Sequence, residues 1–592
     1  MARNLFNSVP VKPVKRNSFG LSHTNDFTTD YGLITPVLVF DTYAGEIFKL
    51  SNESFVRTQP LRAPAFMQAD VSYHWFFVPH RLVYDDWSNF IVRGRDGNTP
   101  YDKPYCILKD MFGGDENNPV NQFLTPCSLF DFLNFPTFND PATFVSDVVK
   151  AGSYKVDMMP FNAYNLIYNE YYRDENLQPE VFIWSMSGRS DNVQDLSDYQ
   201  SEIMQDWHSL QATLFVIPWI LRRRAWRKDY FTSALPFVQK GVPISFAGSV
   251  DPVSGNHTVP VHIGLSQWSS GDPTTWFLGL RGVGSSNLTG DLYGFSRTAG
   301  ASGSEGHVHL PNGTAPNSTF TRNVFARFSL PELQAVVMDI SQLRVGLALQ
   351  QWFELNARTG SDRYYEYLLG HFGVRDRDSR LQRPEYIGGY SHSIQISEVE
   401  QTSATSGTSP QGNLAGRGLG YSANSALKYR CPEPGWIFCL QSIRPRAVYY
   451  QGWPRMYQRW DSFDYFDPFF DHLSEQAIKN SELYFEPSVE PLSGDDRDFG
   501  YTPRFSEYRW MPNQLHGDMR FTLNYWVSPR KFSSANASLT SDFISIDGYA
   551  QGLYDSFAYP GTALNPAPHF ICHIVNHVKA IRPMSRYATP KL

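Results

Sequence analysis

An alternation of apolar and polar side chains with a period of two recurs along this chain and limits its fold more than any other feature. Every second side chain is mostly apolar in residues 519–527 and again in residues 570–578. This period predicts β-strands, because successive side chains of a strand point to opposite faces of the sheet. Residues 71–78 are bulky in both alternating sets, which predicts a central strand buried on both faces. Short strands separated by long loops favour an antiparallel sandwich over a parallel α/β sheet.

Two segments have the period of a helix instead. In residues 163–173, one stripe is spaced at i, i+3, i+4 and i+7, and it consists of Tyr164, Ile167, Tyr168 and Tyr171. This spacing predicts an amphipathic helix with Asn162 as its N-cap and with Asn165 on another face. A second apolar stripe predicts a helix over residues 339–357.

The first of these helices carries a resemblance to a known family. Residues 159–178 read MPFNAYNLIYNEYYRDENLQ and resemble the major capsid proteins of the Microviridae, the small tailless single-stranded DNA phages, above all their gokushovirus-like branch. Further segments carry the resemblance in the same order along the chain: 19–33, 75–90, 229–241, 380–390, 399–403, 499–510 and 582–590.

The resemblance implies a mainly β fold, an eight-stranded antiparallel jelly-roll sandwich with long loop insertions and a few helices. It also implies a structural protein that self-associates into an icosahedral shell around a circular single-stranded DNA genome. Four regions are expected within the 592 residues: a basic N-terminal arm (1–25), the first part of the jelly roll with inserted helices (26–241), a surface protrusion at the threefold axes (242–323), and the second part of the jelly roll with a basic C-terminal tail (324–592).

Both ends of the chain are basic although the formal net charge is −7. Residues 1–25 and 556–592 contain no acidic residue. Clustered cations neutralise phosphates, so we expect the ends to face the packaged DNA, although short basic tails can also be merely solvated. The candidate DNA contacts are Arg3, Lys12, Lys15, Arg16, Lys579, Arg582 and Arg586. Because so few cations cannot neutralise a genome, a small basic DNA-packaging protein and other minor virion proteins are expected as partners.

Residues 242–323 differ in composition from the rest of the chain. Gly, Ser, Thr, Asn and Pro dominate there, and charged residues are sparse. We expect an exposed module that contacts a bacterial surface receptor, with a passive surface loop as the alternative. Its candidate host-contact residues are Trp268, Trp276, Arg281, Asn287 and Tyr293.

Residues 222–228 form the strongest basic run, with Trp226 between the cations. Interleaved basic and aromatic side chains can bind single strands through charge and stacking. Arginines also pair with acidic residues of neighbouring subunits. The sequence leaves these two interpretations open.

No catalytic or metal-binding motif is recognisable. His573 and His577 lie on one predicted strand, where a spacing of four residues corresponds to about 13 Å, too far to share an ion. Residues 461–475 contain the densest cluster of carboxylates, with Asp461, Asp464 and Asp467 among them. The cluster fits no calcium loop, and a structural loop is the favoured interpretation. The alternative function is a carbohydrate-active or glycan-binding β-sandwich protein that uses these carboxylates.

The longest apolar run, residues 214–221, is too short to cross a bilayer, so we expect no membrane insertion. The five cysteines form no C-x-x-C pair, which suits a reducing compartment. We therefore expect assembly in the bacterial cytoplasm, a final location in the virion, and no enzymatic activity, cofactor or bound metal.

Overall fold

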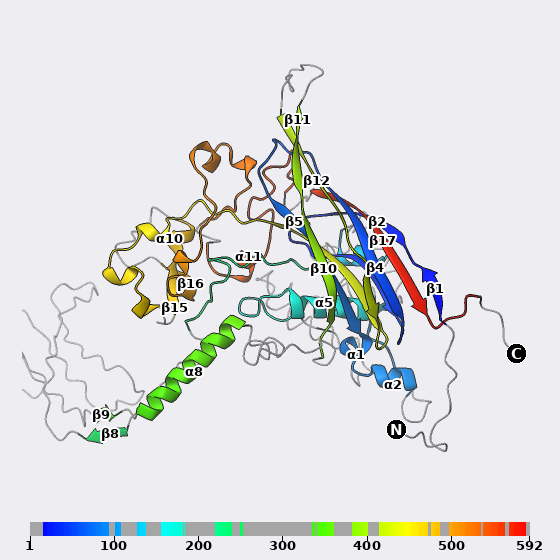
Figure 1. Ribbon diagram of the computed structural model, residues 1–592, viewed down its shortest axis with the longest axis horizontal. Coiled ribbons are helices and arrows are strands. Elements are labelled where there is room, and N and C mark those ends of the chain that lie inside the picture. The colour runs from blue at the N-terminus through cyan, green and yellow to red at the C-terminus, as the bar shows by residue number, and fades with distance from the viewer. Residues whose placement is uncertain are drawn as a thin grey trace, which may run out of the picture. The chain divides into compact units, whose positions relative to one another are not determined.

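The computed structural model describes these residues: 16–93, 101–107, 127–137, 155–181, 183, 219–238, 249–252, 334–337, 340–359, 382–400, 414–471, 475–485, 497–533, 537–562 and 567–587. The chain divides into two compact units, one made of Met1–Val242 with Gln351–Leu592 and the other of Pro243–Gln350. The first unit contains the two large sheets (Figure 1).

One sheet has four antiparallel strands in the order β10-β5-β14-β3. Their bounds are β3 Thr35–Thr42, β5 Ala69–Pro79, β10 Glu385–Ser393 and β14 Gly435–Pro445. β5 lies inside this sheet, paired with β10 on one side and β14 on the other. The prediction of a central strand at residues 71–78 is therefore confirmed.

The other sheet has seven strands, and its main order is β1-β17-β4-β12-β11. β2 also pairs with β17, and β13 with β4. The bounds are β1 Asn17–Gly20, β2 His23–Thr29, β4 Ile47–Thr58, β11 Gln395–Glu400, β12 Leu414–Ala423, β13 Leu427–Arg430 and β17 Phe570–Arg582. β17 confirms the strand predicted from the alternation after Phe570.

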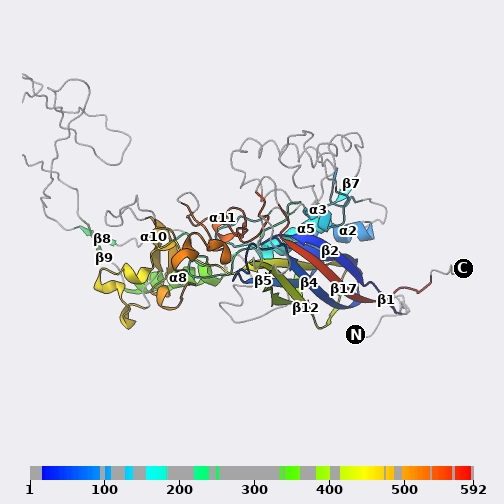
Figure 2. The same ribbon diagram turned by 90° about the horizontal axis from the view of Figure 1, so that it is seen from above.

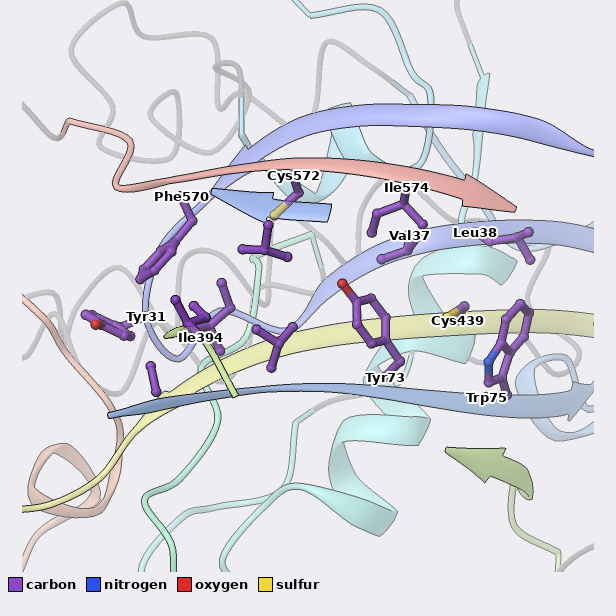
Figure 3. Packing of buried hydrophobic residues seen from close by; sticks show 14 of the residues in the cluster. Tyr31, Val37, Leu38, Tyr73, Trp75, Ile394, Cys439, Phe570, Cys572 and Ile574 are labelled. Atoms are coloured by element: carbon purple, nitrogen blue, oxygen red, sulfur yellow. The ribbon is translucent and has the colours of Figure 1, made fainter. Parts of the chain in front are cut away.

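The two sheets face each other across the main hydrophobic core and form an antiparallel β-sandwich. Cys572 and Ile574 of β17 point toward Tyr73 and Cys439 of the opposite sheet (Figure 3). These four side chains are at most 1% exposed, because the alternation places every second residue of each strand in the core. The predicted β class is confirmed, while the jelly-roll connectivity and the count of eight strands stay predictions.

A helical layer covers the outer face of the four-stranded sheet. The helix α5, Met159–Tyr171, shares a buried hydrophobic cluster with Phe76 and Val78 of β5, the second alternating set of that strand. Figure 2 shows the ribbon of α5 beside the sheets. This layer explains why β5 is buried on both faces. The helix itself is confirmed, but the predicted cap is wrong: α5 begins one turn earlier, with Met158 at the N-cap, and the buried Asn162 Nδ2 donates to the carbonyl of Val83.

A third core lies beside the sandwich. Here the short strands β15 (Glu475–Lys479) and β16 (Asp498–Pro503) pair, and α10 (Asn480–Leu483) and α11 (Ser541–Ile544) add Leu483 and Ile544 to a separate cluster. The cluster is rich in aromatic side chains, with Phe231, Tyr449, Phe499, Phe532 and Phe543 among them.

The first unit also contains the short elements α1 His80–Val83, α2 Trp87–Val92, β6 Tyr105–Ile107, α3 Leu129–Phe132, β7 Lys155–Asp157 and η8 Ser506–Tyr508. In the second unit, β8 (Ser249–Pro252) pairs with β9 (Gln334–Val337). The helix predicted over residues 339–357 is confirmed as α8, Ile340–Thr359.

The strand predicted over residues 519–527 is wrong. This segment contains two 3₁₀ turns, η9 (Gly517–Arg520) and η10 (Asn524–Trp526). Phe521, on the mostly apolar face of the predicted strand, is 74% exposed. Within the described ranges no strand pairs with this segment, and alternation alone cannot supply the missing hydrogen-bond partner.

Candidate assembly and DNA-contact surfaces

The basic run at residues 222–228 is held along its backbone by distant parts of the same chain. Arg222 accepts a hydrogen bond from the amide of Ile34, and the amide of Arg224 donates to the carbonyl of Gly32. Gly32 has a φ of +77°, and a Cβ atom there would lie 2.6 Å from Ile546 Cβ. The close approach therefore requires glycine at this position.

The side chains of the run are also used within the subunit. Arg222 is buried, its Nε donates to Asn165 Oδ1 at 3.1 Å, and burial lowers its pKa to about 10. Arg227 Nη2 lies 2.8 Å from Asp70 Oδ2, and Lys228 pairs with Asp174. The sequence leaves DNA binding and pairing with a neighbouring subunit open, and the structure adds that Arg227 and Lys228 have acidic partners in their own chain.

The carboxylate cluster caps turns. Asp464 Oδ2 accepts hydrogen bonds from the amides of Trp460 and Asp461, both at 3.0 Å. Asp467 Oδ1 accepts from the amide of Phe469 at 2.8 Å. Within the part of the chain that the structure describes, no group of three His, Cys, Asp or Glu residues could hold a metal. These contacts support the interpretation of the cluster as a structural loop.

The same loop exposes an unusual amount of apolar surface. We call residues 453–470 the aromatic loop. Trp460 is 80% exposed and Phe469 is 84% exposed. The loop also exposes Trp453, Met456, Tyr457, Phe463, Tyr465 and Phe466. So many exposed apolar side chains in one loop mark an interaction surface, because their contact with water is unfavourable.

Ion pairs hold the aromatic loop on the third core. Arg455 Nη1 lies 3.1 Å from Glu482 Oε1, and Arg459 Nη2 lies 3.4 Å from Glu507 Oε1. Burial raises the pKa of Glu482, although Arg455 opposes this shift. Arg459 also lies 4.2 Å from the ring centre of Tyr508. The loop consists of three 3₁₀ turns, η4 Arg455–Tyr457, η5 Ser462–Asp464 and η6 Pro468–Phe470, presented on this framework.

Both basic ends leave the seven-stranded sheet at one place. Asn17 pairs with Arg582 between β1 and β17, and Asn17 Nδ2 donates to the carbonyl of Met584 at 2.7 Å. Arg582 Nε lies 2.7 Å from the buried Glu46 Oε1, so this predicted DNA contact is already paired. Lys579 and Arg586 are exposed.

Several other predicted contacts fall on residues that the structure does not describe. At the N-terminus these are Arg3, Lys12 and Lys15. All five candidate host-contact residues, Trp268, Trp276, Arg281, Asn287 and Tyr293, also lie outside the described residues. Arg16 is described, and its Nη1 donates to the carbonyl of Gly45 at 2.7 Å.

The sequence that forms this sandwich matches known proteins along nearly its whole length. A family model described as capsid protein (F protein) matches residues 7–592. The chain belongs to this capsid protein family.

Curated relatives agree over nearly the whole length. The capsid protein VP1 of Chlamydia phage 1 is 31% identical, with 100% of this chain and 98% of the relative covered. The VP1 proteins of Bdellovibrio phage phiMH2K and Spiroplasma virus 4 are 29% and 28% identical, covering 91% and 98% of this chain and 89% and 96% of the relatives. The predicted resemblance to Microviridae capsid proteins is confirmed.

The capsid protein is thus a structural component of a phage virion. None of its described helices is long and apolar enough to span a bilayer. The sequence interpretation used the carboxylates of the aromatic loop and overlooked its apolar residues. A signal was present: nine large apolar side chains lie within residues 453–470, and Trp453, Met456, Tyr457 and Trp460 have the i, i+3, i+4 and i+7 spacing of an amphipathic helix.

Proposed function

We propose that this capsid protein is the major shell subunit, which self-associates into a closed icosahedral shell around a circular single-stranded DNA genome. The exposed aromatic loop is the observation that carries the proposal. A lone subunit leaves Trp460 and Phe469 in water, whereas contact with another copy buries them. Aromatic side chains are enriched in the energetically dominant centres of interfaces. Closed symmetry then ends growth at a fixed number of copies.

Electron microscopy of the purified protein tests this role. Wild-type protein should form uniform closed particles, and the W460A/F469A variant should form far fewer. Tyr559→Ala is the matched control, because Tyr559 is a similarly exposed aromatic residue, at 72%, outside the aromatic loop. Normal particles from W460A/F469A would exclude the aromatic loop as an assembly contact, and wild-type protein that stays monomeric would exclude the shell role.

An enzymatic role is not part of the proposal. Asp464 and Asp467 accept hydrogen bonds from backbone amides, and Asp471 Oδ1 lies 2.8 Å from Arg509 Nη2. Carboxylates committed in this way are poor candidates for the paired acid and base that a glycosidase needs. Turnover of an oligosaccharide by the purified protein, lost in D464N/D467N, would instead establish the carbohydrate-active alternative.

The proposed partners follow from charge and composition. The basic ends contact DNA phosphates, a small basic packaging protein neutralises the remaining charge, and residues 242–323 contact a bacterial receptor. Later in the chain, α8 exposes Val345 (60%) and Leu347 (53%), which suits a projection completed by other copies. Replacing residues 242–323 with a short Gly/Ser linker should abolish adsorption while shells still form. Normal adsorption of such shells would overturn the receptor role.

A further inference from the structure

Three lysines lie in one row across the seven-stranded sheet. Lys49 of β4 is directly opposite Lys579 of β17 on one side and directly opposite Lys428 of β13 on the other. We call these three residues the lysine row. All three are exposed, whereas their neighbours Leu50 and Val578 point into the core. The row therefore lies on the outer face of the sandwich, where β1, β17 and β4 run side by side (Figure 1).

This arrangement is unfavourable for an isolated subunit. Side chains directly opposite each other on neighbouring strands have Cβ atoms about 5 Å apart, and like charges in that position repel. Among the described residues, no carboxylate lies within ion-pair distance of the three amino groups. The nearby Glu53 pairs with His577 at 3.2 Å, and Arg430 adds another exposed cation two residues beyond Lys428.

The lysine row differs from every other described lysine. The structure describes eight lysines in all, and the other five each have an anionic or aromatic partner. Lys103, Lys228, Lys479 and Lys531 pair with aspartates, and Lys155 lies over the ring of Tyr105. The three described lysines without such a partner are the ones that lie opposite one another on neighbouring strands. A partner outside the described chain would remove their repulsion.

We propose that the lysine row binds the phosphate backbone of single-stranded DNA, so that the outer face of the seven-stranded sheet lies toward the genome. The inference rests on the proposed enclosure of DNA by the shell. A lysine is a compact point charge that binds phosphate without reading sequence. Lysines are depleted in protein–protein interfaces, which disfavours a neighbouring subunit as the partner.

The position of the row supports the same ligand. β1 and β17 bring the two acid-free chain ends together at Asn17 and Arg582, three residues beyond Lys579. On the β1 side, Gly20 is opposite Lys579, and no atom of the described residues lies within 4 Å of where its Cβ would be. The row is therefore open on that side and continuous with the basic ends. A strand of DNA can follow both.

The test measures binding of full-length protein to a fluorescent oligothymidylate at several salt concentrations. In K49Q/K428Q/K579Q, the affinity at low salt should fall about tenfold or more, and the slope of log K against log salt should shrink by about 2, or roughly 0.7 for each lost cation. The charge-conserving K49R/K428R/K579R variant should bind like wild type. Unchanged affinity and slope in the glutamine variant would overturn the proposal.

A single-site pair keeps the test valid if the triple variant fails to fold. K49Q should weaken binding more than R57Q, since Arg57 is an exposed cation of the same strand and face outside the row. Equal effects would reduce the row to nonspecific surface charge. Loss of shells in the triple glutamine variant with unchanged DNA binding would assign the row to a contact between subunits, which also overturns the proposal. Electron microscopy of the wild-type protein measures shell formation independently of DNA binding. A failure of the proposed shell role can therefore be told apart from a failure of the proposed DNA contact.

Discussion

The helix α5 and the aromatic loop are both rich in aromatic residues, but they use them in opposite ways. In α5, Phe161 and Tyr164 are completely buried against the four-stranded sheet. In the aromatic loop, Trp460 and Phe469 are at least 80% exposed. The apolar content of a segment therefore does not tell whether it stabilises its own subunit or the contact between subunits. What differs is the supporting structure, a sheet face for α5 and a set of 3₁₀ turns for the loop.

The charged side chains that contact the two regions also differ in their partners. Beside α5, the buried Arg222 donates through Nε to the side-chain amide oxygen of Asn165. Beneath the aromatic loop, Arg455 and Arg459 form ion pairs that fix the turns while the rings above them stay exposed. The aromatic side chains of α5 lie in the core of the subunit, whereas those of the aromatic loop lie on its surface.

The largest effect is expected from Tyr164→Ala in α5. The Tyr164 hydroxyl donates to the carbonyl of Ile34 at 2.8 Å and accepts from the amide of Arg222 at 3.0 Å. Loss of the ring leaves a cavity and two unpaired groups, so the free energy of unfolding should fall by about 3–5 kcal/mol. Denaturant unfolding of the purified subunit measures this. Tyr465→Ala in the aromatic loop is the control, and equal losses in both variants would remove the contrast.

Ile167→Ala should lower the yield of soluble subunit more than Asn165→Ala. The first creates a cavity costing about 2–5 kcal/mol. The difference in yield between the two variants should be modest, because Asn165 is itself completely buried and accepts a hydrogen bond from Arg222 Nε. Its loss leaves a buried donor unpaired and should cost about 1–3 kcal/mol. Equal yields would show that the stripe of α5 contributes no more than the polar contacts beside it.

His74, under the end of α5, should make the subunit sensitive to acid. Burial, with smaller contributions from Arg224 and Arg444, lowers its pKa from 6.5 to about 3. A lowered folded pKa means that stability is complete above 6.5 and is lost as the pH falls toward 3. The melting temperature should drop over this window, and His74→Gln should flatten the drop. An unchanged pH profile in that variant would assign the acid sensitivity to other groups.

The smallest effect on the subunit is expected from the aromatic loop. Because Trp460 and Phe469 are almost fully exposed, W460A and F469A should each change the free energy of unfolding by less than about 0.5 kcal/mol. Chemical unfolding of unassembled subunits is the measurement. A loss above about 2 kcal/mol in either variant would mean that the loop belongs to the core of its own subunit, and the comparison with α5 would fail.

Local periodicity was sufficient for several elements. The alternation after Phe570 predicted β17, the two bulky sets around Trp75 predicted a strand covered on both faces, and the helical spacing around Ile167 predicted α5. These predictions succeeded because burial acts on side-chain spacing within one segment. The family resemblance added the capsid function, which no periodicity contains.

Local patterns failed wherever the outcome depended on a distant partner. Residues 519–527 alternate like a strand, but no strand of the described residues pairs with them, and they contain 3₁₀ turns. For residues 222–228 the sequence leaves a nucleic-acid site and a subunit contact open, and only the structure reveals that Arg227 pairs with Asp70 and Lys228 with Asp174. Neither partner is visible from the segment itself.

The sequence by itself determined which segments alternate, which are helical, and that the chain ends are basic. The tertiary structure alone decided that Lys49, Lys428 and Lys579 form one row, because strand register joins residues hundreds of positions apart. It also decided that the aromatic loop stays exposed while α5 is buried. The physical reason is common to both: charge repulsion and solvent exposure depend on distances in space, and those distances exist only once the sheets have paired.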